Sequence, residues 1–210
     1  IVRGKTETIP RTVAGVTREQ LIRVANLCKS AKFGAVYFGL GITMTRGKYK
    51  NIRNAIELVS ELNRHTKFTI SAMRGHYNVY GSNEVNTWMT GYPFGIDFSR
   101  GIAFYNPGET TAVDILARKE CDAALIVGSD PAAHFPRKCL EHLAEIPVVQ
   151  LDPYPNATTA FCNVQIPVAV TGIDAEGTAY RMDGVPIRTR KVISTVYPSD
   201  REVLLKMYTL

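Results

Sequence analysis

The sequence predicts an α/β protein in which a mostly parallel, doubly wound sheet carries helices on both faces. Two observations lead to this prediction. Short apolar segments alternate along the chain with longer amphipathic segments that have helical spacing. The apolar segments are nearly continuous, which is typical of parallel strands that are buried on both faces.

The elements of the first half follow from this pattern in order. The segment "VTREQLIRVANLCKSA" predicts a helix that begins with a capping box of Thr17 and Gln20. "FGAVYFGLG" predicts a buried strand, "NIRNAIELVSELNRHT" a helix and "KFTISAM" a second strand. The polar residues 74–108 match neither period, so we expect a long functional loop there.

Regular structure resumes after residue 108. Helices are predicted at "ETTAVDILARK" and "PRKCLEHLAE", and strands at "DAALIVGS", "IPVVQLD" and "NVQIPVAV". The tail "EGTAYRMDGVPIRTRKV" predicts a hairpin segment that turns at Asp183-Gly184. We therefore expect one α/β region over residues 1–192 and a C-terminal segment over residues 193–210.

Composition limits the classes of function. The net charge of +6 fits an anionic ligand or an acidic partner, and it equally fits an ordinary basic surface. No Lys/Arg-rich run stands out, so nucleic acid is not indicated. No apolar run approaches the length of a membrane span.

The four cysteines are Cys28, Cys121, Cys139 and Cys162, and no two of them form a C-x-x-C pair. This spacing argues against a zinc site, an iron–sulfur cluster or a disulfide framework within the sequence. Free core thiols indicate a reducing compartment, so we expect a cytoplasmic protein. The chain starts at Ile1, without an initiating methionine, and we expect it to be part of a longer polypeptide.

Polar loops follow four of the predicted strands: "GLGITMTRG", "RGHYNVYG", "GSDPAAHFP" and "LDPYPNATT". In doubly wound folds, ligands bind beyond the carboxyl ends of the strands. Each loop is rich in glycine or in short polar side chains, which permit close backbone approach and dense hydrogen bonding. Four such loops at one edge predict a crevice for a large polar ligand.

The first loop resembles a nicotinamide dinucleotide fingerprint only in part. Gly39 and Gly41 have the right spacing, but position 44 is Met and the expected acidic residue is missing. The loop also fits a phosphate-facing turn with Thr43, Thr45 and Arg46 as donors at a helix N-terminus. A plain tight turn between a strand and a helix remains open as well.

Two carboxylates stand directly after predicted strands, Asp130 in "GSDP" and Asp152 in "LDP". Each could serve as a helix N-cap, but acids at two adjacent strand ends favour recognition of a nucleotide, through a guanine edge or a ribose. His76 and His134 lie in loops and could shuttle protons. Neither has the neighbours of a metal ligand.

Read in order, the loops resemble a known family. "TMTRGK", "RGHYNV", "TGYPF", "DFSRG", "YNPGE" and "EGTAYRMDGVPIR" are similar to segments of molybdopterin-dependent oxidoreductases of the formate dehydrogenase and dimethyl sulfoxide reductase group. Within that group the sequence resembles the B subunit of archaeal formylmethanofuran dehydrogenase, which is the tungsten or molybdenum subunit. The resemblance runs from about residue 11 to residue 192, and its strength lies in the order of the six motifs.

The resemblance implies a cofactor and assigns residues to it. The cofactor would be a pair of molybdopterin guanine dinucleotides holding one tungsten or molybdenum, bound by residues 1–192. The loop "RGHYN" matches a formate dehydrogenase loop whose arginine lies beside metal and substrate, which makes Arg74 and His76 the catalytic candidates. His76 stands where formate dehydrogenases usually have glutamine. The implied cofactor-binding residues are Gly39, Gly41, Thr43, Thr45, Gly47, Gly75, Asn78, Gly128, Ser129, Asp130, Asp152 and Thr158.

The sequence departs from the family in one respect. The family has a cysteine or selenocysteine that ligates the metal, usually followed by histidine, and an N-terminal cysteine motif for a [4Fe–4S] cluster. None of the four cysteines here has a histidine after it. We therefore expect no metal ligand in this chain, and we expect those groups in an upstream region or in partner subunits.

The implied activity is that of an oxidoreductase: reversible, ferredoxin-linked reduction of CO2 to formate, as in methanogenesis from CO2. The implied partners are an amidohydrolase-like subunit that condenses formate with methanofuran, a β-barrel subunit that completes the pterin site, a β-helical subunit, and a polyferredoxin or an equivalent electron donor. Two alternatives stay open. One is a redox-inactive scaffold subunit of a formyltransferase/hydrolase complex, and the other is a generic nucleotide-binding α/β domain.

Overall fold

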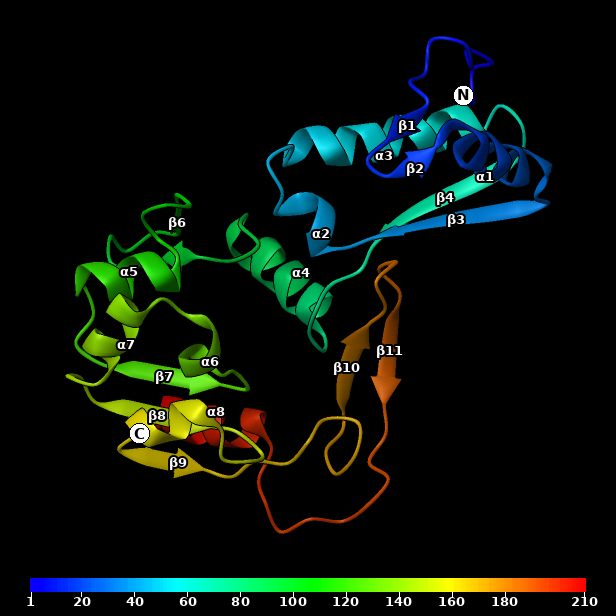
Figure 1. Cartoon of the computed structure of the whole chain (residues 1–210). Coiled ribbons are helices and arrows are strands. Elements are labelled where there is room, and N and C mark those ends of the chain that lie inside the picture. Colours follow the sequence, from blue (N-terminus) through cyan, green and yellow to red (C-terminus); the bar gives the residue numbers. More distant parts are fainter. The chain divides into compact units, whose positions relative to one another are not determined.

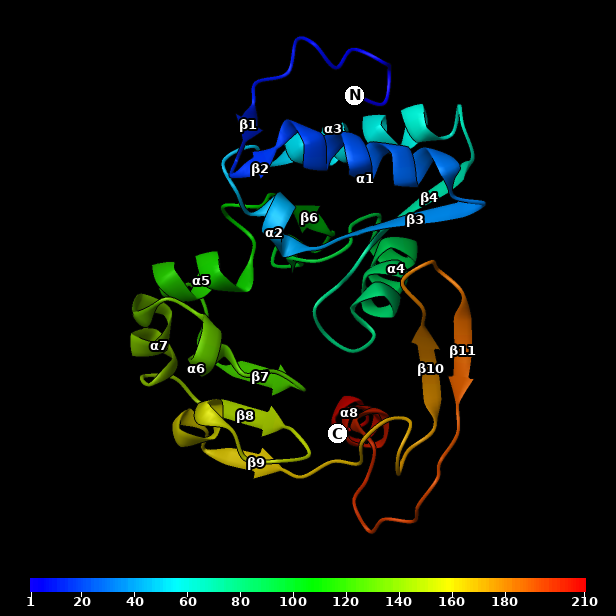
Figure 2. The same cartoon turned by 45° about the vertical axis from the view of Figure 1, so that its right-hand side comes forward.

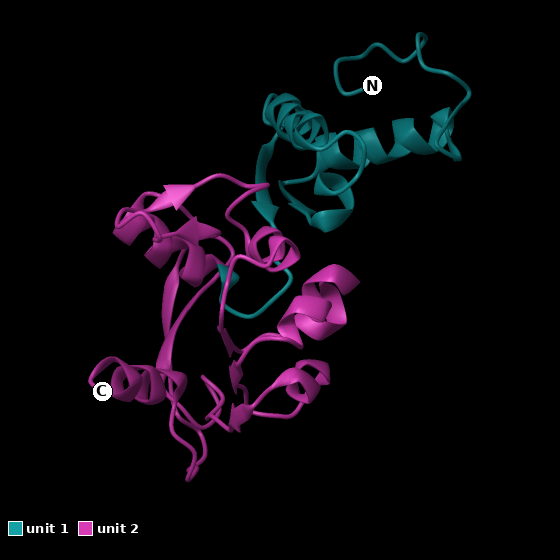
Figure 3. Cartoon of the chain, turned by 90° about the vertical axis from the view of Figure 1, so that its left-hand side faces the viewer, with its two compact units in different colours: residues 1–79 teal, residues 80–210 magenta.

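The computed structural model describes all residues from 1 to 210, and they form two compact units, residues 1–79 and residues 80–210 (Figure 3). Each unit has its own parallel sheet and its own core. The predicted α/β class is confirmed, but the parallel strands lie in two separate sheets, and the chain divides at residue 79 within the single region expected over residues 1–192. None of the helices combines the length and apolar character that crossing a membrane requires.

Unit 1 contains a two-stranded parallel sheet and two long helices, connected as the sequence predicted. A small antiparallel pair precedes them. The elements are β1 (Thr12–Val13), β2 (Val16–Thr17), α1 (Arg18–Ser30), β3 (Phe33–Phe38), α2 (Leu40–Thr43), α3 (Tyr49–Leu62) and β4 (Lys67–Ala72). The capping box of Thr17 and Gln20 is present at the start of α1.

The core of unit 1 lies on one face of its sheet. Val59 and Leu62 of α3 pack on Phe68, and Cys28 of α1 joins the same cluster. Both helices therefore cover the same side of β3 and β4, as Figures 1 and 2 show. Exposure alternates along β3, so this strand is not buried on both faces as the sequence predicted, and the helices of unit 1 leave its Tyr37 side uncovered.

Unit 2 contains a three-stranded parallel sheet in the order β7-β8-β9, an antiparallel hairpin, a short antiparallel pair and several helices. Its elements are α4 (Val79–Thr90), β5 (Ile96–Asp97), β6 (Phe104–Tyr105), α5 (Ala112–Arg118), β7 (Ala124–Val127), α6 (Pro131–His134), α7 (Arg137–Leu143), β8 (Val148–Leu151), the 3₁₀ helix η1 (Ala157–Phe161), β9 (Val164–Ile166), β10 (Gly177–Tyr180), β11 (Pro186–Thr189) and α8 (Asp200–Tyr208).

Both faces of the unit 2 sheet are covered, as expected for parallel strands. Val148 of β8 packs with residues of α5 and α7 on one face. Leu151, three positions along the same strand, packs on the other face with Val203 of α8. Alternation of side chains along a strand explains why these two residues reach opposite cores. The C-terminal residues 193–210 are thus no separate segment, because α8 contributes Val203 to the core of unit 2.

The expected long loop over residues 74–108 is wrong in part, because it contains α4 and the strands β5 and β6. Gly81, Asn83 and several hydroxyl residues give α4 weak intrinsic propensity, which hid it from the sequence pattern. Tertiary packing stabilises it. Tyr80 stacks on Tyr180 of β10 with ring centroids 6.1 Å apart, and Trp88 meets the same ring edge-on at 6.2 Å.

The hairpin predicted at Asp183-Gly184 is confirmed. Strands β10 and β11 pair antiparallel, with Tyr180 opposite Pro186. Gly184 has a φ of +85°, a left-handed conformation that suits glycine. The hairpin supplies Tyr180 to the aromatic cluster on α4, so the two features support each other.

Candidate functional site

In unit 2 the structure brings the predicted site residues together at the carboxyl edge of the parallel sheet. Gly128 follows β7, and its N–H donates to the carbonyl of Leu151 at 2.9 Å, beside Asp152 at the end of β8. Gly128 has a φ of +55°, and a Cβ added there would meet nothing within 4 Å. Gly128 and Ser129 are exposed, so their backbone is open to a ligand.

Asp130 is held by the turn that follows β8. Its Oδ1 accepts hydrogen bonds from the backbone N–H and the hydroxyl of Thr158, at 2.9 and 2.5 Å. The hydroxyl bond is the main reason why the pKa of Asp130 lies below its usual value. Asp130 is therefore a fixed carboxylate at the mouth of the sheet.

Thr158 cannot contact a cofactor directly in this structure. Its side chain is fully buried, and its hydroxyl donates to Asp130 while it accepts from the N–H of Ala132 at 2.9 Å. The residue therefore lies behind the loop and orients Asp130. The sequence pointed to the turn after β8, but it could not show whether Thr158 lines the site or supports Asp130 from behind.

Asp152 is positioned by its own turn. Its Oδ1 accepts from the N–H of Tyr154 at 3.1 Å, and its Oδ2 accepts from the amide of Asn156 at 3.1 Å. Asn156 caps η1 with a capping box that includes Thr159. Sequence reasoning missed Asn156, although an Asn three residues before a Thr is a recognisable start of a helical turn.

A further acid near Asp152 was also missed. Asp200 begins α8, and its Oδ1 is buried without a hydrogen-bond partner. Burial raises the pKa of Asp200 above its usual value, and the negative charge of Asp152 raises it further. Nothing in the sequence connects positions 152 and 200, because only the packing of α8 under the sheet brings them together.

In unit 1 the loop from Gly39 to Gly47 leaves the carboxyl end of β3. The N–H of Met73, just after β4, donates to the carbonyl of Phe38 at 2.7 Å, so the loops after the two strands begin side by side. Asn51 of α3 holds the loop, because its amide donates to the carbonyl of Ile42 at 2.9 Å and to the hydroxyl of Thr45 at 2.7 Å. A Cβ at Gly47 would lie 2.0 Å from the Asn51 amide oxygen, so a larger residue here would displace the Asn51 side chain.

The threonines of this loop were predicted as donors to a phosphate, and here their hydroxyls are used locally. Thr43 donates to the carbonyl of Leu40 and Thr45 to that of Ile42, both at 3.3 Å. Gly41 stands in open space, where an added Cβ would meet nothing within 4 Å. The groups of this loop that a ligand could reach are thus the backbone at Gly41 and the exposed side chain of Arg46.

The second unit 1 loop carries the catalytic candidates. Arg74, Gly75 and His76 are exposed and follow β4 directly. Asn78 has a φ of +55°, a left-handed conformation that asparagine tolerates better than most residues. Arg74 and His76 thus lie exposed just after the end of β4, and the chain turns at Asn78 and enters α4.

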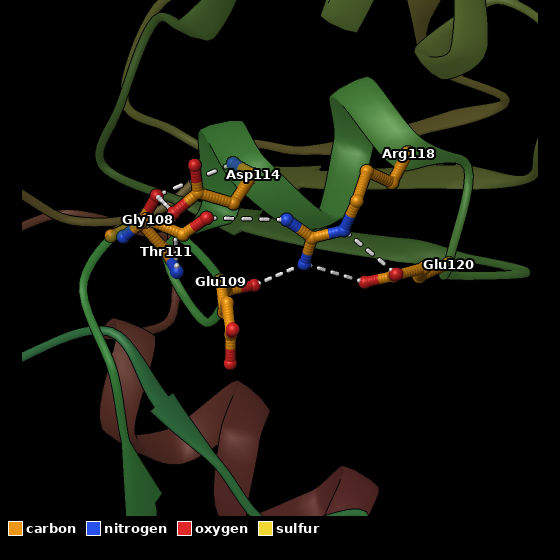
Figure 4. Close-up of polar contacts among 6 residues, drawn as sticks. All are labelled: Gly108, Glu109, Thr111, Asp114, Arg118 and Glu120. Atoms are coloured by element: carbon orange, nitrogen blue, oxygen red, sulfur yellow. Dashed lines mark hydrogen bonds and ion pairs between the residues drawn. The ribbon is translucent and has the colours of Figure 1, made fainter.

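Another polar cluster in unit 2 lines a cavity of about 620 Å³ between β5, β6 and α5. Figure 4 shows that Arg118 donates to the carbonyls of Gly108 and Glu109 and forms an ion pair with Glu120. Asp114, one turn earlier, accepts from the N–H of Gly108 at 3.1 Å. These contacts fix the turn at "NPGE", so the charged side chains of Asp114 and Arg118 stabilise the backbone of that turn.

No group of three histidine, cysteine or acidic side chains in residues 1–210 is arranged to hold a metal ion. The four cysteines are free thiols, and Cys139 is completely buried. Burial raises the pKa of the Cys162 thiol, which is unfavourable for a metal ligand. The residues present therefore do not fit a metal of their own.

The fold has a known counterpart. The chain superposes with a TM-score of 0.65 on a chain in the crystal structure of the formyltransferase/hydrolase complex from Methylorubrum extorquens in complex with methylofuran. The match covers 95% of this chain and 55% of that chain at 17% identity, so it shows a shared α/β fold alone. No family model matches the sequence.

Two relatives are similar in sequence as well. The sequence is 56% identical over 195 residues to the B subunit of tungsten-containing formylmethanofuran dehydrogenase 2 from Methanocaldococcus jannaschii, and 51% identical over 181 residues to the protein of that name from Methanococcus maripaludis. The matches cover 91% and 86% of this chain, and 45% and 42% of the relatives. The chain thus spans less than half of their length. Over the matched residues it is similar in sequence to these formylmethanofuran dehydrogenase B subunits, which confirms the resemblance drawn from the sequence.

Proposed function

We propose that this chain is the guanine-dinucleotide-binding portion of the tungsten or molybdenum subunit of a formylmethanofuran dehydrogenase. One observation carries the proposal: Asp130 and Asp152 are held by a single hydrogen-bonded turn at the carboxyl edge of a parallel sheet. This is where α/β folds bind nucleotides. The relatives that share the sequence are tungsten-containing dehydrogenase subunits.

The unit 2 loops would bind one guanosine arm. A carboxylate accepts N–H donors from a guanine edge or hydroxyl groups from a ribose. Asp130 and Asp152 are oriented for such a role by Thr158 and Asn156, and the exposed backbone at Gly128 and Ser129 gives room for a diphosphate. Thr158 acts in this proposal through Asp130.

The unit 1 loops would contact the second pterin dinucleotide. Gly39 and Gly41 offer backbone without side chains, and Gly75 does the same after β4, whereas Gly47 would take part by making room for the Asn51 amide. Thr43 and Thr45 would contribute as donors only after leaving their local carbonyls. Asn78 would take part through the shape of the turn that it forms.

The metal would be carried by the cofactor pair, since residues 1–210 offer no group that fits it. We assign the cysteine or selenocysteine ligand and the [4Fe–4S] cluster to residues outside this chain or to partner subunits. When bound, the metal and its pterins would supply the redox chemistry between CO2 and formate.

The side chains of the second unit 1 loop would bind the substrate. The guanidinium of Arg74 remains protonated at physiological pH, and its planar fork can bind a carboxylate through two parallel hydrogen bonds. Arg74 would hold formate and stabilise the negative charge that develops as CO2 is reduced. His76 would hold or transfer a proton near the same position. Both side chains are exposed at the end of β4, where a ligand can reach them.

The reaction proposed for the whole assembly is reversible reduction of CO2 to formate with electrons from a ferredoxin or polyferredoxin. The formate would then be condensed with methanofuran in an amidohydrolase-like subunit. A β-barrel subunit that completes the pterin site and a β-helical subunit are the other proposed partners. The cytoplasm would be the location of this assembly.

A second candidate is a scaffold subunit without redox chemistry. It is favoured by the likeness in fold to a chain of the formyltransferase/hydrolase complex. At 17% identity this likeness extends to fold alone, whereas the dehydrogenase subunits share more than half of the aligned residues. We therefore place the redox function first.

The test is the metal and nucleotide content of the natively purified complex that contains this chain. Elemental analysis and chromatography of released nucleotides should give one tungsten or molybdenum and two guanine dinucleotides per copy. A complex without metal and guanine nucleotide that still transfers or hydrolyses formyl groups would overturn the redox proposal in favour of the scaffold.

A further inference from the structure

A single buried amide, Gln150, lies beneath both of the loops that carry the strand-end acids. It is on β8, whose other residues are Val148, Val149 and Leu151. Gln150 has no exposed surface. A buried amide in an apolar strand is unfavourable unless its polar groups are paired, so its partners explain why it is tolerated.

The carboxamide of Gln150 is fully hydrogen-bonded. Its Nε2 donates to Asn156 Oδ1 at 2.9 Å and to the carbonyl of Ser129 at 3.5 Å. Its Oε1 accepts from the hydroxyl of Thr159 at 2.8 Å and from the thiol of Cys162 at 3.6 Å. Gln150 therefore links the loop that follows β7 to the turn that follows β8.

Asn156 connects Gln150 to both strand-end acids, Asp130 and Asp152, through further hydrogen bonds. Its Oδ1 accepts from Gln150 and also from the N–H of Thr158 at 3.0 Å, while its Nδ2 donates to Asp152 Oδ2 at 3.1 Å. Thr158 in turn holds Asp130. The donors from Gln150 and from the Thr158 N–H thus together set which end of the Asn156 amide faces Asp152, and Gln150 is the side chain of the pair.

We propose that Gln150 is a positioning residue that sets the orientation of Asp130 and Asp152 for binding the guanosine arm of the cofactor. The inference rests on the proposed function and adds a residue to it. A side chain that only filled the core could be apolar here, because replacing a buried polar group and its partners by apolar groups is often neutral for stability. The amide is needed where the direction of the Asn156 side chain matters.

Two substitutions separate positioning from packing. Gln150→Met removes all four polar contacts at similar volume. Gln150→Glu keeps the shape but brings a carboxylate oxygen to Asn156 Oδ1, so the Asn156 amide should turn its NH2 toward position 150 and its oxygen toward Asp152. The matched control is Val148→Ala, which is equally buried on the same strand and belongs to the apolar core of α5 and α7.

The experiment measures bound guanine nucleotide, and its rate of release, in the assembled complex with each variant. We expect Gln150→Met and Gln150→Glu to release nucleotide about tenfold faster than the wild type, as is usual for supporting residues behind a bound group. Val148→Ala should lower the unfolding temperature and leave the release rate unchanged. Lowering the pH should restore retention in Gln150→Glu alone, because a protonated carboxyl can again donate to Asn156.

Release rates within twofold of the wild type in both Gln150 variants would overturn this inference and leave the proposed function intact. Equal acceleration by Val148→Ala would also overturn it, because the effect would then reflect general loosening of the core. If Gln150→Met does not fold, the pH dependence of Gln150→Glu decides the question within one protein. A wild-type complex without guanine nucleotide overturns the proposed function, and this inference with it.

Discussion

The two units hold their candidate site residues in different ways. In unit 2, Asp130 is held by the buried Thr158, and Asp152 is held by Asn156, whose amide is bonded in turn to the buried Gln150. In unit 1, the loop after β3 is held mainly by the amide of Asn51, and the residues after β4 are exposed. The candidate residues of unit 2 are therefore tied to a buried hydrogen-bonded network, whereas Arg74 and His76 in unit 1 are exposed to solvent.

The difference corresponds to the two tasks in the proposed function. Recognition of a nucleotide requires acceptors at fixed positions, and a buried polar network provides them because each partner is satisfied. A residue that binds a small substrate must remain accessible, so less of its surroundings can be buried. The covering of the sheets agrees with this, since helices pack on both faces in unit 2 and on one face in unit 1.

The largest effect is expected from substitution of an exposed candidate residue of unit 1, Arg74. We expect Arg74→Ala to lower CO2/formate turnover of the complex by about a thousandfold, because it removes the group that would stabilise the developing negative charge. Bound pterin should remain largely in place. Arg137→Ala, an arginine with 92% side-chain exposure on α7, is the matched control and should leave turnover unchanged. Undiminished turnover in Arg74→Ala would mean that Arg74 has no catalytic role.

Substitution of Thr158, a buried residue of unit 2, is expected to lower stability. Thr158→Val leaves the N–H of Ala132 without its acceptor and removes one donor from Asp130. The free energy of unfolding should fall by about 1–3 kcal/mol, measured by urea denaturation. Thr43→Val, whose hydroxyl bonds only to its own helical turn, should change it by less than about 0.5 kcal/mol. Equal losses of unfolding free energy in Thr158→Val and Thr43→Val would contradict the stated difference between the two units.

The same Asp130 contact has a pH dependence. Since the pKa of Asp130 is lower in the folded state, its contribution to stability is present above the unfolded pKa and is lost as the pH falls through the folded pKa. Thr158→Val should weaken this acid-side loss of stability. Unfolding curves between neutral and acidic pH would detect the change.

Two glycines of the unit 1 loop should respond in opposite ways. Gly47→Ala displaces the Asn51 amide and should cost about 1 kcal/mol of stability, because two hydrogen bonds are disturbed. Gly41→Ala meets open space in a helical turn and should be neutral or stabilising by up to about 1 kcal/mol. If the loop contacts the cofactor, Gly41→Ala should nevertheless lower the bound nucleotide. Unchanged nucleotide content in Gly41→Ala would argue that this glycine lies away from the cofactor.

The smallest effect is expected at Asp200. Its pKa is raised in the folded state, so stability falls as the pH rises from the unfolded pKa through the folded pKa. Asp200→Asn should therefore raise the unfolding temperature at neutral pH by roughly 2 °C and have less effect in acid. Glu202→Gln on the same helix is the control of opposite sign, because hydrogen bonds from Ser199 lower the pKa of Glu202. A destabilised Asp200→Asn at neutral pH would contradict this account.

Local patterns determined much of the secondary structure. The capping box of Thr17 and the turn at Asp183-Gly184 were readable because each depends on residues within a few positions of one another. The parallel strands were readable from their apolar runs, and the strand-end acids followed from the rule that ligands lie at carboxyl ends. The helix α4 was not readable, because its Tyr80 and Trp88 pack on Tyr180, which lies far along the chain beyond any local pattern.

By itself, then, the sequence determined the α/β class, most of the longer helices and parallel strands, and the resemblance to a known family, and it predicted Asp130, Asp152 and Arg74 as site residues. Only the tertiary structure decided that Thr158 supports and does not line the site, that Gln150 and Asn156 connect the two acids, and that Asp200 lies near Asp152. It also decided that the strands form two sheets in two units. The physical reason is that burial and hydrogen-bond partnership are properties of residues far apart in the chain, whereas propensity, capping and turn chemistry act between neighbours.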